Sequence, residues 1–120
     1  MRLFHEAASA SVRDAVHALV KGWPGVEART MMGCPGWRVH GSLIASVIDG
    51  GVVLHTLSPE ESGAARRELG GGPFRPTAAR SVASWLVVPL AADQVRRVEP
   101  WLRACYERAK EKGKKGKVRV

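Results

Sequence analysis

The sequence predicts an α+β domain, a two-layer sandwich in which an antiparallel sheet carries helices on one face. Three observations lead to this fold class. Apolar residues recur at helical spacing near both ends of the chain, short segments rich in Val, Ile and Leu lie between them, and hairpin turns rather than crossovers join the first of these segments. The expected order is helix, three strands, helix, one or two strands, and a last helix.

The composition is that of one globular domain: 120 residues, of which 45% are hydrophobic and 25% charged. The net charge is +8, and the last ten residues hold five Lys or Arg against one Glu, which is +4 of that total. We therefore expect a folded domain over residues 1–110 and a flexible basic tail over residues 111–120. The tail is either a solubilising terminus or a phosphate-binding arm.

The first helix is indicated by Val12, Val16 and Leu19, which recur at helical spacing. Ser11 and Asp14 have the spacing of a capping box at its start, whereas Phe4, Ala7 and Ala8 would allow the helix to extend toward the amino end.

Three strands are expected before the second helix. Residues 26–33, VEARTMMG, suit a short strand, and residues 34–37, CPGW, are typical of a tight turn because proline fixes φ and glycine can take a positive φ. Residues 37–48, WRVHGSLIASVI, predict one buried strand with a bulge at Gly41.

A hairpin follows at Asp49-Gly50-Gly51, because Asp-Gly between apolar runs supplies the two residues that tolerate positive φ. We expect residues 43–48 and 52–57 to pair antiparallel across this turn.

The second helix is expected to begin behind Ser58 as N-cap and to end after Leu69. Residues 84–90, SWLVVPL, form an apolar strand, and residues 93–110 suit a long last helix. Pro100 interrupts that helix, so we expect either a kink or a short helical turn followed by the main helix.

The glycine run at residues 70–72 raises the possibility of a phosphate-binding loop. Such a loop places backbone N–H groups at the start of a helix, whereas these glycines follow one, and Pro73 and Pro76 lack N–H donors. We interpret the run as a helix stop, after which Phe74 anchors the chain in the core.

Two stretches resemble known families. Residues 24–61, PGVEARTMMGCPGWRVHGSLIASVIDGGVVLHTLSPEE, resemble the YjbR (MmcQ)-like group, where a PGVEE-type turn precedes G-x-P-x-aromatic-R-V-x-G and a glycine-turn hairpin. Residues 71–90, GGPFRPTAARSVASWLVVPL, are similar to the TfoX N-terminal domain. The resemblance covers most of residues 11–110 and implies an α-β-β-β-α-β-β-α fold of the secretion-chaperone-like type. Arg38 matches the pattern, whereas Gly41-Ser42 departs from its usual Gly-Lys.

The resemblance implies a regulatory role, with a shape likened to DNA-binding domains, and it supplies no catalytic motif and no cofactor. We therefore expect a non-enzymatic regulatory or binding domain whose partner is nucleic acid. The candidate contacts are Trp37, Arg38, Lys112, Lys114, Lys115, Lys117 and Arg119. Arginines elsewhere, Arg66, Arg67, Arg75 and Arg80, are a second source of positive charge.

Two other readings remain open. The first is a protein-interaction module, monomeric or homodimeric, that docks through its sheet or a helix face. The second is a thiol or metal enzyme built on Cys34 with His40 and His55, although a buried thiol and an unliganded histidine pair fit the same residues. The chain has two cysteines, whose spacing suits neither a disulfide framework nor a metal site, and we expect reduced thiols. The sequence also shows no signal or membrane segment, so we predict a cytoplasmic protein that does not enter the membrane.

Overall fold

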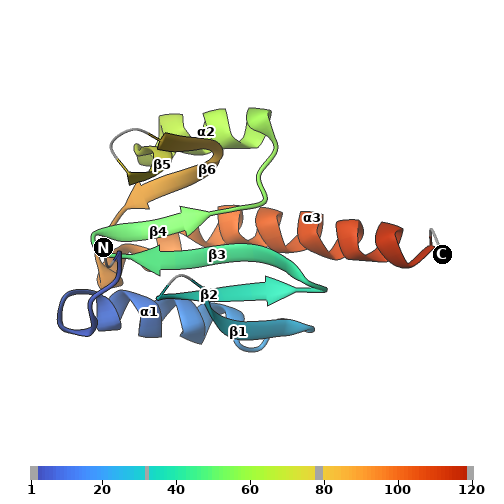
Figure 1. The fold of residues 1–120 in the computed structure, drawn as a ribbon, viewed down its shortest axis with the longest axis horizontal. Coiled ribbons are helices and arrows are strands. Elements are labelled where there is room, and N and C mark those ends of the chain that lie inside the picture. Colours follow the sequence, from blue (N-terminus) through green and yellow to red (C-terminus); the bar gives the residue numbers. More distant parts are fainter. Residues whose placement is uncertain (1–2, 32, 78–79, 119–120) are drawn as a thin grey trace.

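The computed structural model describes residues 3–31, 33–77 and 80–118, and over residues 75–84 and 112–118 it describes the backbone alone. The predicted α+β class is confirmed, because helices pack on an open, fully antiparallel sheet of six strands in the order β1-β2-β3-β4-β6-β5 (Figure 1). The elements are α1 (Glu6–Val20), β1 (Val26–Met31), β2 (Cys34–Val39), β3 (Ser42–Ile48), β4 (Gly51–Leu54), α2 (Pro59–Leu69), β5 (Gly72–Thr77), β6 (Arg80–Pro89), the 3-10 helix η1 (Ala92–Val98) and α3 (Glu99–Val118).

The segment expected as one strand, residues 37–48, is a hairpin of β2 and β3, so four strands precede α2 instead of three. His40 and Gly41 both have positive φ, 51° and 82°, as the tight turn of a hairpin requires. The predicted bulge at Gly41 is therefore wrong, and the irregularity lies instead between Trp37 and Arg38, where the β2–β3 register shifts.

The predicted turn at residues 34–37 is also wrong, because these residues open β2. Pro35 lies opposite Thr30 of β1, and pairing of β2 with β3 begins only at Gly36. Pro35 therefore has no partner on β3, and its missing N–H removes no hydrogen bond between β2 and β3. A proline is tolerated at such a position at the start of a strand.

The hairpin at Asp49-Gly50-Gly51 is confirmed, with Ala45 opposite Leu54 and Ile48 opposite Gly51. The expected positive φ is present at Gly50, 86°, but not at Asp49. The returning strand ends at Leu54 rather than at residue 57.

Helix boundaries follow local rules in α2 and less so elsewhere. The Ser58 hydroxyl accepts the N–H of Glu61 at 3.1 Å, and the Glu61 carboxylate accepts the N–H of Ser58 at 2.8 Å, which confirms the predicted N-cap. The capping box expected at Ser11 is wrong, because α1 already begins at Glu6. At the last helix the second alternative is confirmed, since η1 ends at Val98 and α3 starts at Glu99, just before the proline.

The glycine run is a helix stop, as expected. Gly70 caps α2 with φ of 82°, and Gly71 has φ of 99°. A Cβ on Gly71 would lie 2.0 Å from the carbonyl oxygen of Val87, so the backbone approach between β5 and β6 requires glycine there. Phe74 follows with 4% of its surface exposed.

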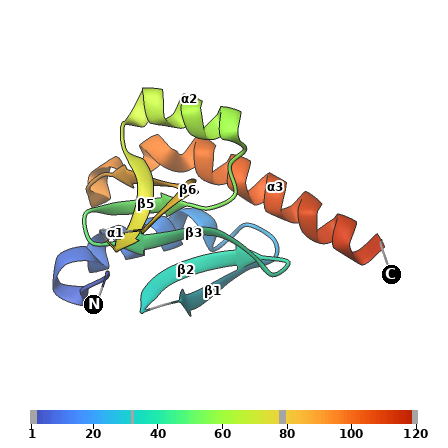
Figure 2. The same cartoon turned by 45° about the horizontal axis from the view of Figure 1, so that its top comes forward.

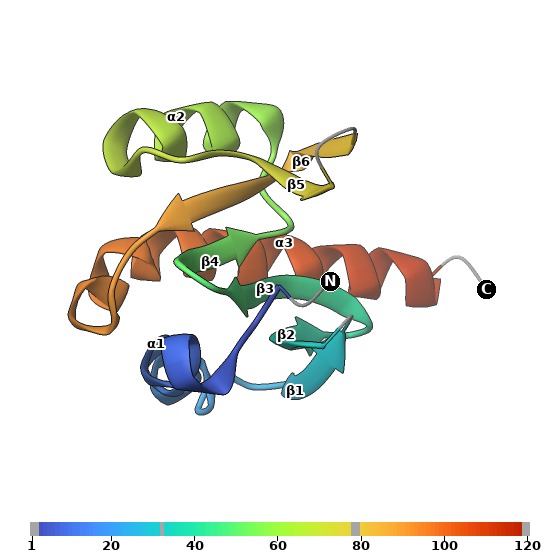
Figure 3. The ribbon, with the colours of Figure 1, turned by 60° about the vertical axis from the view of Figure 1, so that its left-hand side comes forward.

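The sheet and helices form two layers (Figures 2 and 3). Both α1 and α3 pack against β3, α3 also packs on β2 and β4, and η1 packs against α1. Helix α2 packs against β6, and Glu61 of α2 pairs with Arg108 of α3 at 2.8 Å. The largest side chains with less than 2% exposure include Tyr106, Ile44, Leu54, Leu102, Val16, Val20, Val47 and Val52.

Candidate functional site

The basic end of the chain is a projecting helix in the structure. Residues 111–118, expected to belong to a flexible basic tail, continue α3 to Val118, and this part of α3 passes beyond the strand ends in Figures 1 and 2. The backbone of Lys112, Lys114, Lys115 and Lys117 therefore lies on the helix, whereas Arg119 lies outside the described residues. We call residues 111–118 the basic arm.

The part of α3 before the basic arm is fixed in the core. Leu102, Cys105 and Ala109 are fully buried, and the Tyr106 hydroxyl donates a hydrogen bond to the carbonyl oxygen of Pro24 at 2.6 Å. Burial in apolar surroundings raises the pKa of the Cys105 thiol to about 12, so this cysteine is a structural residue. The arm thus extends from a rigid support.

The cations on this first part of α3 have partners within the chain. The Arg103 guanidinium lies 4.2 Å from the ring centroid of Trp23, and Arg108 pairs with Glu61. Lys110 lies 3.9 Å from Glu107 and 5.0 Å from the centroid of Tyr106. Each of these positive charges therefore interacts with an aromatic ring or a carboxylate.

Trp37, predicted to lie at a turn and to contact nucleic acid, is buried in β2 with 2% of its surface exposed. Its indole N–H donates to Nδ1 of His17 at 3.1 Å. Stacking on a base needs an accessible ring face, which this tryptophan lacks. The structure therefore assigns Trp37 to packing of α1 against the sheet.

Arg38, the second predicted contact on the sheet, is half-buried, with its side chain 34% exposed. Its Nε lies 3.7 Å from the Glu27 carboxylate, and this nitrogen makes no hydrogen bond within the described residues. Arg38 therefore neighbours an acid on β1.

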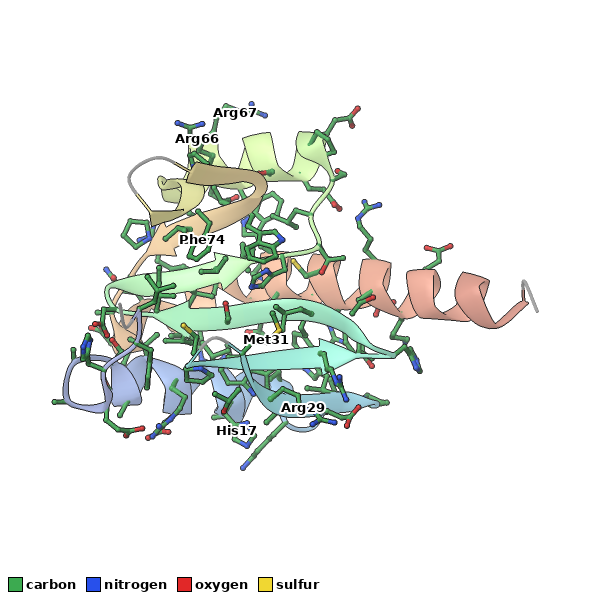
Figure 4. The ribbon with its side chains drawn as sticks, viewed as in Figure 1. His17, Arg29, Met31, Arg66, Arg67 and Phe74 are labelled. Carbon is green, nitrogen blue, oxygen red and sulfur yellow. The ribbon has the colours of Figure 1, made fainter. Side chains whose placement is uncertain are left out.

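The remaining arginines of the prediction fall into two sets. Arg66 and Arg67 are exposed on α2 (Figure 4) and make no ion pair within the described part of the chain. The side chains of Arg75 and Arg80 lie outside the described residues. Arg66 and Arg67 are therefore two exposed cations of the globular part without an ion-pair partner among the described residues, as are Lys21, Arg96 and Arg97.

The enzyme alternative gains no support from the geometry of its three residues. Cys34 is 4% exposed, and burial raises the pKa of its thiol, which is opposite to the shift that activates a nucleophilic cysteine. Nε2 of His55 lies 2.8 Å from the Ser46 hydroxyl, and the ring packs edge-on against Trp85. Burial lowers the pKa of His55 to about 4, which keeps it neutral at physiological pH.

Cys34 and His55 do line one cavity, but it measures only about 10 Å³, room for about one water molecule. His40 occupies the exposed β2–β3 turn. Among the described residues no group of three or more His, Cys, Asp or Glu is placed to hold a metal ion.

A groove that the sequence did not reveal lies between α1 and the β1–β2 edge. Its volume is about 400 Å³, and Figure 4 shows two of its residues, His17 of α1 and Arg29 of β1. Its walls are formed by Arg13, Asp14, His17, Ala28, Arg29, Thr30, Pro35, Gly36 and Trp37. The polar residues of α1 recur at helical spacing, and this pattern could have indicated the wall that α1 forms. The wall formed by β1 and β2 could not be predicted in this way, because it depends on the order of strands in the sheet.

The positive charge of this groove is largely compensated. Arg13 forms ion pairs with Glu6 and Asp14, and these two hydrogen bonds raise the pKa of Arg13. Arg29 lies 4.0 Å from Glu27. These acidic neighbours reduce the positive charge that the groove offers to a phosphate, strongly at Arg13 and weakly at Arg29.

Within the described residues no helix is both long enough and apolar enough to cross a membrane. No protein-family model, no curated protein and no solved structure matches this chain.

Proposed function

We propose that the chain is a cytoplasmic, non-enzymatic nucleic-acid-binding domain of the TfoX-N/YjbR-like type, and that it holds phosphates with the basic arm. The observation that carries the proposal is the course of α3, whose backbone stays helical to Val118 beyond the sheet and carries four lysines between residues 112 and 117. The motif resemblance to TfoX and YjbR domains adds a regulatory role to this proposal.

Charge supports assigning the contact to the arm. The last ten residues account for +4 of the net +8. On the earlier part of α3 the cations already interact with Trp23, Glu61, Glu107 or Tyr106. Lysines that neutralise phosphates release condensed counterions, which gives affinity that depends strongly on salt and little on sequence.

Helical geometry suggests how the arm meets a duplex. At about 100° per residue, positions 112, 114, 115 and 117 lie at about 0°, 200°, 300° and 140° around the axis. The lysine positions surround the helix instead of forming one stripe. This distribution suits a helix flanked by phosphates on two sides, as in a major groove, which is wide enough for an α-helix.

The test is a titration with mixed-sequence duplex DNA at several salt concentrations, comparing the full chain with a truncation after Lys110. Each lost phosphate contact reduces the slope of log K against log salt by about 0.9, so the truncation flattens it by up to about 4. Affinity at low salt falls strongly, and circular dichroism checks that the globular part stays folded.

A matched pair of variants locates the contact. Lys114→Gln/Lys115→Gln and Arg66→Gln/Arg67→Gln remove the same charge from two different places. We expect the arm variant to reduce the slope by about 2 and the α2 variant to leave it nearly unchanged. Equal changes in both variants, or equal slopes for the full and truncated chains, would refute the arm as the binding element.

A further inference from the structure

Strand β1 is an edge of the sheet with little cover from the rest of the chain. Five of its six residues, from Glu27 to Met31, are exposed. Only β2 pairs with it among the described strands, so its outer edge has unpaired backbone groups. On the helix side, Ala28 and Thr30 border the 400 Å³ groove rather than packed side chains. An edge of this kind is a template for an added strand.

The position of Pro35 on β2 determines which residues of β1 direct their backbone N–H and C=O groups to the open edge. In an antiparallel pair, alternate residues direct both N–H and C=O toward the partner strand, and those between direct them away. Pro35, which lies opposite Thr30, has no N–H, so this pair is of the non-hydrogen-bonded kind. Thr30 and Ala28, two residues apart, therefore direct their backbone groups to the open edge.

We propose that the occupant of this edge is a second copy of the chain, paired antiparallel through β1 with Ala28 opposite Ala28 across a two-fold axis. This register makes Ala28 a hydrogen-bonded pair that exchanges two backbone bonds. It also places Glu27 opposite Arg29 of the second copy, and Arg29 opposite Glu27, in the non-hydrogen-bonded positions, where Cα atoms approach to about 4.5 Å. The strand is thus complementary in charge to itself.

The charges select this register over its neighbours. In a hydrogen-bonded pair of edges, a residue whose backbone groups face the open edge lies opposite another such residue. The two adjacent registers that satisfy this condition place Glu27 opposite Glu27 or Arg29 opposite Arg29. Like charges directly opposite each other destabilise a sheet. Within one chain these two side chains are only loosely paired, at 4.0 Å, and are 55% and 54% exposed. Both therefore remain accessible to a second copy.

The competing role of edge charges is to keep strands apart. Sedimentation equilibrium at low salt, without nucleic acid and from micromolar to near-millimolar protein, separates the two roles. We expect the wild type to dimerise, and Glu27→Arg and Arg29→Glu each to weaken the dimer by about tenfold or more, because each reversal creates two like-charge pairs. Circular dichroism confirms that each exposed-strand variant folds.

The decisive measurement uses a mixture of the Glu27→Arg and Arg29→Glu variants. In a mixed dimer every cross-strand pair is again Glu opposite Arg, so association returns although neither variant associates well alone. The rescue also controls for the loss of the Glu27–Arg38 contact in Glu27→Arg. A wild type that stays monomeric throughout, a dimer that neither reversal weakens, or a mixture without rescue would overturn the proposal. None of these results bears on DNA affinity, so the proposed function is tested separately.

Discussion

The two parts of α3 use the same secondary structure for opposite purposes. Residues 99–110 bury Leu102, Cys105 and Ala109 completely and direct their cations to partners in the chain. The basic arm continues the helix past the sheet with a sequence of lysines and glycines that offers no apolar stripe. Stability therefore resides in the first part and the proposed phosphate binding in the second, and changes to one part should leave the property of the other unaltered.

The largest effect is expected from Leu102→Ala. This side chain is fully buried between α3 and the sheet, and such truncations lower the free energy of unfolding by about 2–5 kcal/mol. Urea unfolding measures the loss. The salt slope of DNA binding, measured where the variant is still folded, should match the wild type, and a changed slope would show that the two parts of α3 are coupled.

The next largest effect is a dependence of the free energy of unfolding on pH, which we assign to His55. The backbone of His55 and that of Thr56 contact the Cys105 thiol of α3. Native His55 has a pKa of about 4 against 6.5 in an ordinary site, so between these values the unfolded chain binds a proton that the native chain does not. Stability is complete above about pH 6.5 and falls as the pH is lowered, by about 2 kcal/mol from pH 7 to pH 5. Lysine side chains stay protonated over this pH range, so the charge of the basic arm does not change with it.

Urea unfolding of the wild type and of His55→Gln at both pH values checks this expectation. The variant should lose this pH-dependent component. A wild type whose stability varies no more than that of the variant would contradict the assignment to His55.

A smaller effect is expected from Tyr106→Phe. The change removes the hydrogen bond to Pro24 and leaves that carbonyl oxygen without its donor, at a cost of about 1–2 kcal/mol in the free energy of unfolding. Thermal unfolding measures the loss of stability. An unfolding free energy equal to that of the wild type would show that the bond contributes nothing to fixing α3.

The smallest effect on stability is expected from Gly113→Ala/Gly116→Ala. Each alanine favours the helix by about 1 kcal/mol, so helicity should rise while the global unfolding transition stays within about 0.5 kcal/mol of the wild type. If the arm binds as a helix, DNA affinity should increase by up to about tenfold. Weaker binding by the more helical variant would mean that the arm contacts phosphates in an extended form.

Local chemistry explains which elements could be predicted from the sequence. The start of α2 was predictable because Ser58, Pro59 and Glu61 form a self-contained cap, and the turn at Asp49-Gly50 carries its own conformational signal. The β2–β3 turn was missed because a histidine, not Asn or Asp, takes the first positive φ. Local patterns identify an element only when its own residues determine it.

The candidate site was less predictable than the fold. Trp37 was expected at a turn because Pro35-Gly36 resembles one, yet pairing with β1 and β3 makes the segment a central strand and buries the ring. The lysines of the basic arm were predicted from charge alone, and their place on a continuation of α3 was not, because Gly113 and Gly116 are poor helix formers. The open edge at β1 depends on strand order, which no single segment of sequence determines.

The length of the basic arm limits how much nucleic acid one molecule can cover. Eight residues at about 1.5 Å each extend about 12 Å, the axial rise of three to four base pairs. The arm itself therefore covers few base pairs, and the larger globular part sets how closely neighbouring molecules can bind along a duplex. Saturation stoichiometry on duplexes of increasing length should then follow the width of the whole molecule, 28 Å in each of its two shorter dimensions, and not the reach of the arm.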